Sequence, residues 1–159
     1  MREIVFKAKR VDDGVWVYGS YTAMREDDHN ECFRTKPHKI YHRIWQWESG
    51  DWNMGGYANY EVTPETVCQW IGLLDKQGVK IFEGDILKTD DGDIVEVRYE
   101  KIYASFGIWK EGWAFLHYFH EAVEPENCEV IGSIHDKARQ KQALINMMRM
   151  DEELGLYDE

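Results

Sequence analysis

The sequence predicts a mainly β protein, with short antiparallel strands in a small barrel-like architecture and a carboxy-terminal α-helix. Three observations lead to this prediction. Residues 12–14 and 90–92 both read Asp-Asp-Gly, which supplies the positive-φ residues that tight hairpin turns need. Residues 93–100 alternate apolar and polar side chains, as a half-buried strand does. Residues 136–159, in contrast, are rich in helix-forming residues.

We expect a β domain over residues 1–135, followed by a helix and tail over residues 136–159. Residues 20–60 are the least regular part, and we expect an insertion or a long loop region there. Short strands separated by turns favour a small barrel or sandwich over a βαβ fold. The expected strands are 3–9, 15–18, 39–47, 66–72, 79–82, 86–89, 93–100, 103–109, 112–119 and 128–134.

The expected helix begins at Asp136, a suitable N-cap residue, and ends at Gly155. Its basic residues lie near the amino end and its acidic residues near the carboxyl end, which opposes the helix dipole. We therefore expect the helix to depend on burying an apolar stripe, either against its own domain or against another subunit. The candidate interface residues in this stripe are Leu144, Met147, Met148 and Leu154.

Composition and charge narrow the class of protein. The 159 residues are 43% hydrophobic and 14% aromatic, which is enough to build a core. Nineteen basic against thirty acidic side chains give a net charge of -11, so we expect no sequence-independent nucleic-acid binding. No apolar run approaches the ~20 residues of a membrane span. With no secretory signal and three widely spaced cysteines, the sequence predicts a cytoplasmic protein.

One cluster has the residue types of a zinc site. It consists of His29, Cys32, His38 and His42. Only five residues separate Cys32 from His38, fewer than the loop that normally lets two ligand pairs converge. The strand-like sequence after Pro37 also opposes placing both histidines on one helical face. We expect loop residues here, and a metal-dependent enzyme using residues 29–42 remains an alternative.

The other reactive side chains are expected to be structural. His117 and His120 lie three apart on an expected strand and so point to opposite faces. Cys68 lies in a strand-like run without a local base, which predicts a buried, inert thiol. Aspartates tolerate turn geometry, so the acidic residues 83, 85, 90, 91 and 93 are interpreted as turn residues. We therefore expect no catalytic residue, no cofactor and no metal.

Aromatic residues are frequent between residues 41 and 60. They are Tyr41, Trp45, Trp47, Trp52, Tyr57 and Tyr60. Single-strand nucleic-acid grooves combine such rings with basic residues, but only Lys39 and Arg43 lie near in sequence. Packing in the core or between subunits is the expected role. Trp45, Trp47 and Trp52 are therefore further candidates for a partner or oligomer interface.

A set of motifs in residues 62–88 resembles the central signature of the YopX family of phage and prophage proteins. The motifs are PETV at 64–67, QWIGL at 69–73, DKQG at 75–78 and FEGDI at 82–86. Residues 2–8 (REIVFKA) are similar to the family's opening strand, and residues 129–134 (EVIGSI) to its closing motif. The sequence departs from the family at Cys68, where glycine is frequent, and in the extension after Asp136.

The resemblance implies a mainly β, barrel-like fold and a phage or prophage gene, and it transfers no catalytic residue. We predict a non-enzymatic phage accessory protein that binds other proteins or assembles with itself. One alternative is an acidic inhibitor of a host nucleic-acid-binding or defence enzyme, since carboxylate rows can imitate a phosphate backbone. A partner protein is thus expected, and a membrane is not.

Overall fold

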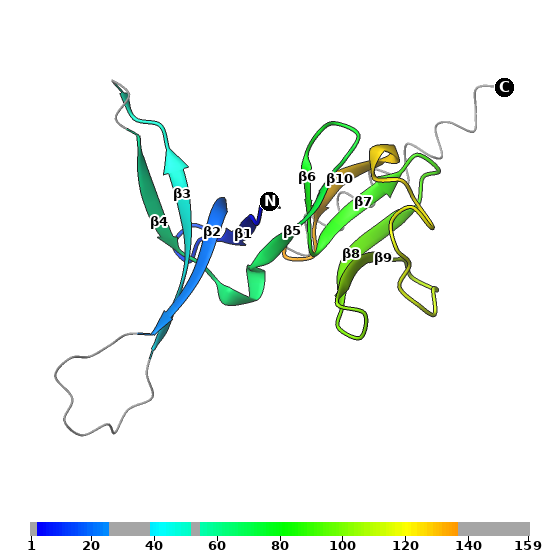
Figure 1. Cartoon of the computed structure of the whole chain (residues 1–159), viewed down its shortest axis with the longest axis horizontal. Helices are drawn as coiled ribbons and strands as arrows, with labels where there is room; N and C mark the ends of the chain where they lie inside the picture. Colours follow the sequence, from blue (N-terminus) through cyan, green and yellow to red (C-terminus); the bar gives the residue numbers. More distant parts are fainter. Residues whose placement is uncertain (1–2, 26–38, 52–54, 137–159) are drawn as a thin grey trace. The chain divides into compact units, whose positions relative to one another are not determined.

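The structure is a computed structural model, and it describes residues 3–25, 39–51 and 55–136 (Figure 1). The chain divides into two compact units, Met1–Trp70 and Ile71–Glu159. The described secondary structure is almost entirely β. The strand pairs β1–β2, β1–β5, β2–β3, β3–β4, β7–β8, β7–β10 and β8–β9 are all antiparallel. The mainly β prediction is therefore confirmed.

Within the described residues, the strands β1–β10 and the short 3₁₀ turns η2 and η3 follow one another in sequence. The first unit contains β1 (Phe6–Lys9), β2 (Trp16–Arg25), β3 (Ile40–Glu48), β4 (Gly56–Glu61) and η2 (Pro64–Thr66), and β5 (Cys68–Leu74) begins in it and ends in the second unit. The second unit continues with β6 (Lys80–Phe82), β7 (Asp85–Thr89), β8 (Ile94–Glu100), β9 (Ser105–Trp109), η3 (Pro125–Asn127) and β10 (Cys128–Ser133).

In the first unit, β1 to β4 form a meander of hairpins, and β5 pairs with β1 on the other side, which gives the order β4-β3-β2-β1-β5. The β1–β2 hairpin turns at residues 12–14, as the sequence predicts. Gly14 has a φ of +71°, and Asp13 fixes the turn by accepting a hydrogen bond from the Val15 backbone N–H at 3.0 Å. Such aspartate bonds hold the chain reversal without help from distant residues.

The core of the first unit lies on one face of this sheet. Strand alternation brings together Ala8, Val17, Ile44 and Val62, which are all buried. The end of β4 turns back to β1 through an isolated bridge between Arg10 and Val62. This bridge joins the ends of the meander beside the core.

Gly19 marks a close approach between β2 and β3. A Cβ atom at this position would lie 2.0 Å from the Trp45 carbonyl oxygen, and the φ of Gly19 is +157°. Because the obstacle is backbone, no side chain can move aside to make room. Gly56, in contrast, has open space around its absent Cβ.

We predict that Gly19→Ala lowers the free energy of unfolding by about 1–3 kcal/mol, because strands β2 and β3 must separate to admit the methyl group. Gly56→Ala is the matched control and should change it by less than about 0.5 kcal/mol. Urea denaturation of the two variants compares these values. Equal stabilities would show that the close approach does not constrain the sheet.

The second unit contains a four-stranded antiparallel sheet in the order β10-β7-β8-β9. Its core consists of Ile71, Ile81, Leu87, Val95, Val97, Ile108, Phe119 and Cys128. The alternation in β8 is confirmed, since Val95 and Val97 are buried while the intervening Glu96 is not. β6 pairs with β5.

A buried carboxylate connects the β5–β6 turn to β10. The Oδ1 atom of Asp75 accepts hydrogen bonds from the Gln77 and Val79 backbone N–H groups at 2.8 and 2.9 Å. Its Oδ2 atom accepts one from the Val130 N–H at 3.0 Å. Asp75 is 5% exposed, so its two oxygens are satisfied by backbone donors from two distant segments.

We predict that Asp75→Asn destabilises the second unit by about 1–3 kcal/mol, although the two side chains have the same shape. The amide offers one acceptor oxygen, and its NH₂ group would face a backbone N–H that needs an acceptor. Asp91→Asn, at an exposed turn position, is the control and should be neutral. Thermal unfolding of both variants is the measurement; equal melting temperatures would contradict this role of Asp75.

Three sequence predictions need correction or fall outside the described residues. A closed barrel is wrong, because β4 and β1 meet at one isolated bridge and the described edge strands β9 and β10 do not pair with each other. The strand expected at 112–119 is also wrong. Turns at Gly112 and at Tyr118 leave only a single bridge between His117 and Ile108. The helix expected over 136–159 lies outside the described residues.

Strand β4 is the element that the sequence analysis missed. Residues 56–61 (GYANYE) lie in the segment expected to be an insertion or loop. They nevertheless pair with β3 over six residues, from Glu61 opposite Arg43 to Gly56 opposite Glu48. Glycine and asparagine disfavour strands, and Tyr57 and Tyr60, three residues apart, do not show the period-two alternation that indicates a strand.

Candidate functional site

The face of strands β2–β4 opposite the core carries most of the aromatic side chains of this segment. The registers place cross-strand partners on the same side of the sheet, so Trp45 lies beside Ser20 and Asn59. We call this side the aromatic face. Its residues are Ser20, Thr22 and Met24 of β2, Tyr41, Arg43, Trp45 and Trp47 of β3, and Tyr57, Asn59 and Glu61 of β4.

Polar contacts fix the middle of the aromatic face. The Trp45 indole Nε1–H donates to the Thr22 hydroxyl at 3.0 Å. Arg43 donates from Nη1 to the Asn59 side-chain oxygen at 3.1 Å, and its guanidinium carbon lies 5.6 Å from the Tyr41 ring centroid. Each strand is therefore connected to its neighbour through side chains as well as backbone. A face held in this way is preorganised for contact.

Trp47 and Tyr57 form an exposed aromatic pair at one end of the aromatic face. They are direct cross-strand partners, with ring centroids 5.1 Å apart and planes at 76°. The two residues are 58% and 68% exposed. A Cβ on Gly55 would lie 2.4 Å from the Trp47 ring, so glycine allows the indole to lie close to the backbone there. Large exposed rings in contact with each other are typical of interaction surfaces.

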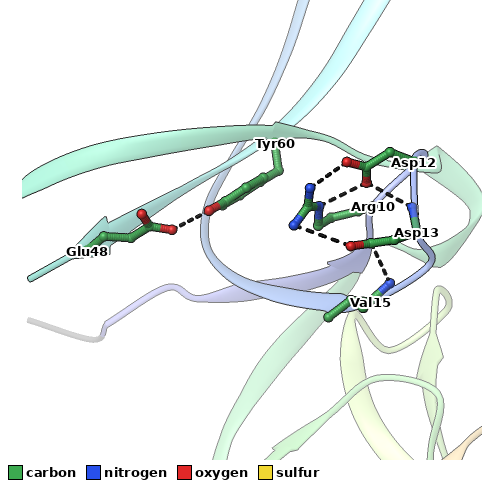
Figure 2. Close-up of polar contacts among 6 residues, drawn as sticks. All are labelled: Arg10, Asp12, Asp13, Val15, Glu48 and Tyr60. Atoms are coloured by element: carbon green, nitrogen blue, oxygen red, sulfur yellow. Dashed lines mark hydrogen bonds and ion pairs between the residues drawn. The ribbon is translucent and has the colours of Figure 1, made fainter.

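The opposite side of the same sheet carries a chain of polar contacts (Figure 2). Tyr60 of β4 donates its hydroxyl proton to Glu48 of β3, and the Arg10 guanidinium lies 4.6 Å from the Tyr60 ring centroid. Arg10 also pairs with Asp12 and Asp13 of the hairpin turn. The hydrogen bond to Glu48 raises the pKa of Tyr60, and Arg10 lowers the pKa of Asp12. These residues join the β1–β2 turn to β3 and β4.

The proposed zinc ligands are not brought together within the described part of the chain. His42 lies in β3, where its Nδ1 is hydrogen-bonded to the Tyr21 hydroxyl and its ring stacks on Tyr21 with centroids 6.0 Å apart. His29, Cys32 and His38 lie outside the described residues. Over residues 3–25, 39–51 and 55–136, no group of three or more His, Cys, Asp or Glu side chains is arranged to hold a metal ion.

His117 and His120 also have separate surroundings. The His117 ring packs edge-on against Trp113, with centroids 4.4 Å apart. His120 has a φ of +69° and pairs with Glu124 through its Nδ1. The two histidines therefore have different partners.

The turn motif at residues 82–86 is structural. Gly84 has a φ of +76°, its N–H donates to the Val97 carbonyl, and its carbonyl accepts from the Ile134 N–H. The fully buried Asp85 accepts the Phe82 N–H at 2.9 Å. Burial raises the pKa of Glu83. The interpretation of these acidic residues as turn and strand-entry geometry is confirmed for Asp85.

Both described cysteines are buried and not disulfide-bonded. The Cys68 thiol donates to the Thr66 carbonyl at 3.3 Å, and the Cys128 thiol donates to the Glu124 carbonyl at 3.5 Å. Burial, with the nearby Asp90 and Asp75 carboxylates, raises the pKa of Cys128 to about 11. The thiolate is the nucleophilic form of cysteine, so Cys128 is protonated and unreactive near neutral pH.

We predict that Cys128 resists modification by Ellman's reagent in the folded protein at pH 8 and reacts once denaturant is added. Cys32→Ser removes the one cysteine outside the described residues before the measurement. The raised pKa also means that the stabilisation from the buried thiol is present below about pH 9 and is lost as the pH rises towards 11. Rapid stoichiometric labelling of native protein would contradict this burial.

Two of the predicted interface residues, Trp45 and Trp47, lie together on the aromatic face. Trp52, Leu144, Met147, Met148 and Leu154 lie outside the described residues. Tyr57 was predicted only as one of several packing aromatic residues, and Asn59 was not predicted, because both belong to β4, which was not expected. Tyr57 and Asn59 are two residues apart, as are Trp45 and Trp47, and this shared spacing was the available signal.

Comparisons with known proteins agree with the architecture. The sequence profile of the YopX protein family matches residues 6–140, most of the chain. The chain belongs to the YopX family. The resemblance to the YopX family that the sequence motifs indicated is thus confirmed.

The crystal structure of protein EF1440 from Enterococcus faecalis has a similar fold, with a TM-score of 0.50 and 23% sequence identity. The match covers 86% of this chain and 96% of that one. No curated protein matches this sequence. In the described residues, no helix is long and apolar enough to cross a bilayer.

Residues of the family motifs make hydrogen bonds that hold the fold together. Thr66 accepts the Lys9 N–H through its hydroxyl at 2.8 Å and donates to the Thr63 carbonyl, so it joins η2 to β1. Asp75 and Asp85 hold turns in the second unit. The signature of this YopX protein therefore maintains the fold, and the aromatic face lies outside it.

Proposed function

We propose that this YopX protein is a non-enzymatic phage or prophage accessory protein of the host cytoplasm that acts by self-association through the aromatic face. The exposed Trp47–Tyr57 pair is the observation that carries the proposal. Aromatic rings of this kind supply much of the binding energy at protein interfaces when a partner removes them from water. The hydrogen bond from Trp45 to Thr22 already holds the indole in place, so less conformational entropy is lost when a partner binds.

The distribution of charge supports contact through the first unit. Residues 1–70 contain nine basic and eleven acidic side chains, whereas residues 71–159 contain ten basic and nineteen acidic ones. Two copies of an acidic protein repel each other, and this repulsion is smallest between their nearly neutral parts. The first unit is therefore the surface on which a second copy can be accommodated.

We predict that Trp47→Ser combined with Tyr57→Ser weakens self-association by at least about tenfold in dissociation constant, because the contact loses its exposed aromatic area. Sedimentation or light scattering over a range of micromolar concentrations gives the constant. Phe115→Ser is the matched control, since Phe115 is 77% exposed but belongs to the second unit.

A wild-type chain that remains monomeric at these concentrations would contradict the proposal. Equal weakening by Phe115→Ser would also contradict it, since the effect would then come from general loss of exposed apolar surface. Circular dichroism of each variant reports whether the sheet is intact.

A second candidate function is inhibition of a host nucleic-acid-binding enzyme through an acidic surface. The excess of acidic residues in the second unit favours it, since nineteen of the thirty acidic side chains lie in residues 71–159. Binding of this kind is electrostatic and weakens as salt rises. Capture of a DNA-binding protein from host lysate at low salt, and its release at high salt, would support this candidate over self-association.

A further inference from the structure

The outer edge of β4 carries backbone groups with no partner in the described chain. The Val62 N–H donates to the His42 carbonyl at 2.9 Å, which makes these two residues a hydrogen-bonded pair of the β3–β4 ladder. Antiparallel ladders alternate hydrogen-bonded and non-hydrogen-bonded pairs. Residues 56, 58 and 60 thus direct their backbone groups to β3, and residues 57, 59 and 61 direct theirs away from it.

Part of this edge is already occupied. The Glu61 carbonyl accepts a hydrogen bond from the Val11 N–H at 3.0 Å, where β4 turns back beside β1. Among residues 3–25, 39–51 and 55–136, none is hydrogen-bonded to the outward backbone groups of Tyr57 and Asn59. The unoccupied edge is therefore short and bounded, with two donors and two acceptors.

This edge lacks the residues and the bulge that usually oppose strand pairing. Natural edge strands are shielded by lysine, proline or a bulge, and residues 56–60 (GYANY) contain no lysine or proline. The β3–β4 register also runs without a shift from Arg43 to Glu48. An edge of this kind is a template for another strand.

We propose that β4 pairs antiparallel with β4 of a second copy of this chain, with Ala58 beside the two-fold axis. The inference rests on the proposed self-association and specifies its geometry. Tyr57 then forms a hydrogen-bonded pair with Asn59 of the partner subunit, and Asn59 forms one with the partner's Tyr57. The two three-stranded segments β2–β4 become one continuous six-stranded sheet.

The register follows from the bounds of the edge. In an alternative register, Asn59 would pair with the partner's Asn59, and Glu61 would then have to pair with the partner's Tyr57. The Glu61 carbonyl, however, already accepts a hydrogen bond from the Val11 N–H. Centring on Ala58 uses only Tyr57 and Asn59, and it places the small Ala58 methyl groups opposite each other. No charged side chain then faces a like charge across the new pair.

A second copy fits this edge better than an unrelated strand because the edge is complementary to itself. Its two outward residues are two apart, so a two-fold axis matches each donor with an acceptor. The aromatic face also stays on one side of the enlarged sheet, which brings both Trp47–Tyr57 pairs next to the interface. Symmetric pairs of identical surfaces are the commonest oligomer interfaces.

Disulfide trapping of Ala58→Cys in a Cys32→Ser background tests the geometry. Facing residues of a non-hydrogen-bonded antiparallel pair lie about 4.5 Å apart between Cα atoms, which a disulfide can span. We expect a covalent dimer under mild oxidation. Ala23→Cys is the matched control, because Ala23 is exposed on the same side of the sheet but lies in β2, away from the edge. It should remain uncrosslinked.

Asn59→Pro provides an independent measurement by light scattering. Proline removes the outward N–H and is tolerated where an edge strand faces solvent. Asn59→Ala is its control, since it also loses the hydrogen bond from Arg43 but keeps the backbone N–H. We expect loss of the oligomer in Asn59→Pro and its retention in Asn59→Ala.

The outcomes separate the two proposals. An oligomer that depends on Trp47 and Tyr57 but gives no crosslink at Ala58 would overturn the strand pairing and leave the proposed function standing. Equal crosslinking of Ala58→Cys and Ala23→Cys would overturn it as well. A monomeric wild type would overturn both. If Asn59→Pro fails to fold, the cysteine pair still decides the geometry.

Discussion

The first unit depends on one constraint, which is that its sheet buries apolar side chains on one face only. Ala8, Val17, Ile44 and Val62 form a small core on one side of the meander, closed at its end by the Arg10–Val62 bridge. Strand alternation then places every second side chain of β3 on the opposite face. Aromatic residues occupy that face, although a solvated face would ordinarily be polar. The exposed rings and the unpaired edge of β4 are two aspects of this one arrangement.

The second unit has a different organisation, in which buried carboxylates hold the turns. Asp75 accepts three backbone N–H groups, and Asp85 accepts that of Phe82. Each of these hydrogen bonds gives an acceptor to a backbone N–H group. Without one, a buried N–H group would lower the free energy of unfolding. These aspartates belong to the motifs that identify the YopX family, so the family signature reflects folding requirements. The surface proposed for association is located elsewhere, on residues that the motifs do not include.

Local patterns predicted much of the fold. The Asp-Asp-Gly turn at 12–14, the alternation in β8 and the buried Cys68 are properties of neighbouring residues, and all three are confirmed. The closed barrel and the strand at 112–119 were wrong, because pairing between distant segments decides whether a sheet closes. The site was predicted in part: Trp45 and Trp47 were identified, while Tyr57 and Asn59 require knowledge of β4.

The sequence by itself determined the family, the mainly β class and the positions of the tight turns, because each depends on residue types at short spacing. Only the tertiary structure decided which aromatic residues share a face and which backbone groups lie on an edge. Those properties depend on register, and register is set where segments distant in sequence meet. The pairing of Trp47 with Tyr57 across β3 and β4 is an example, since the two residues are ten positions apart in the sequence.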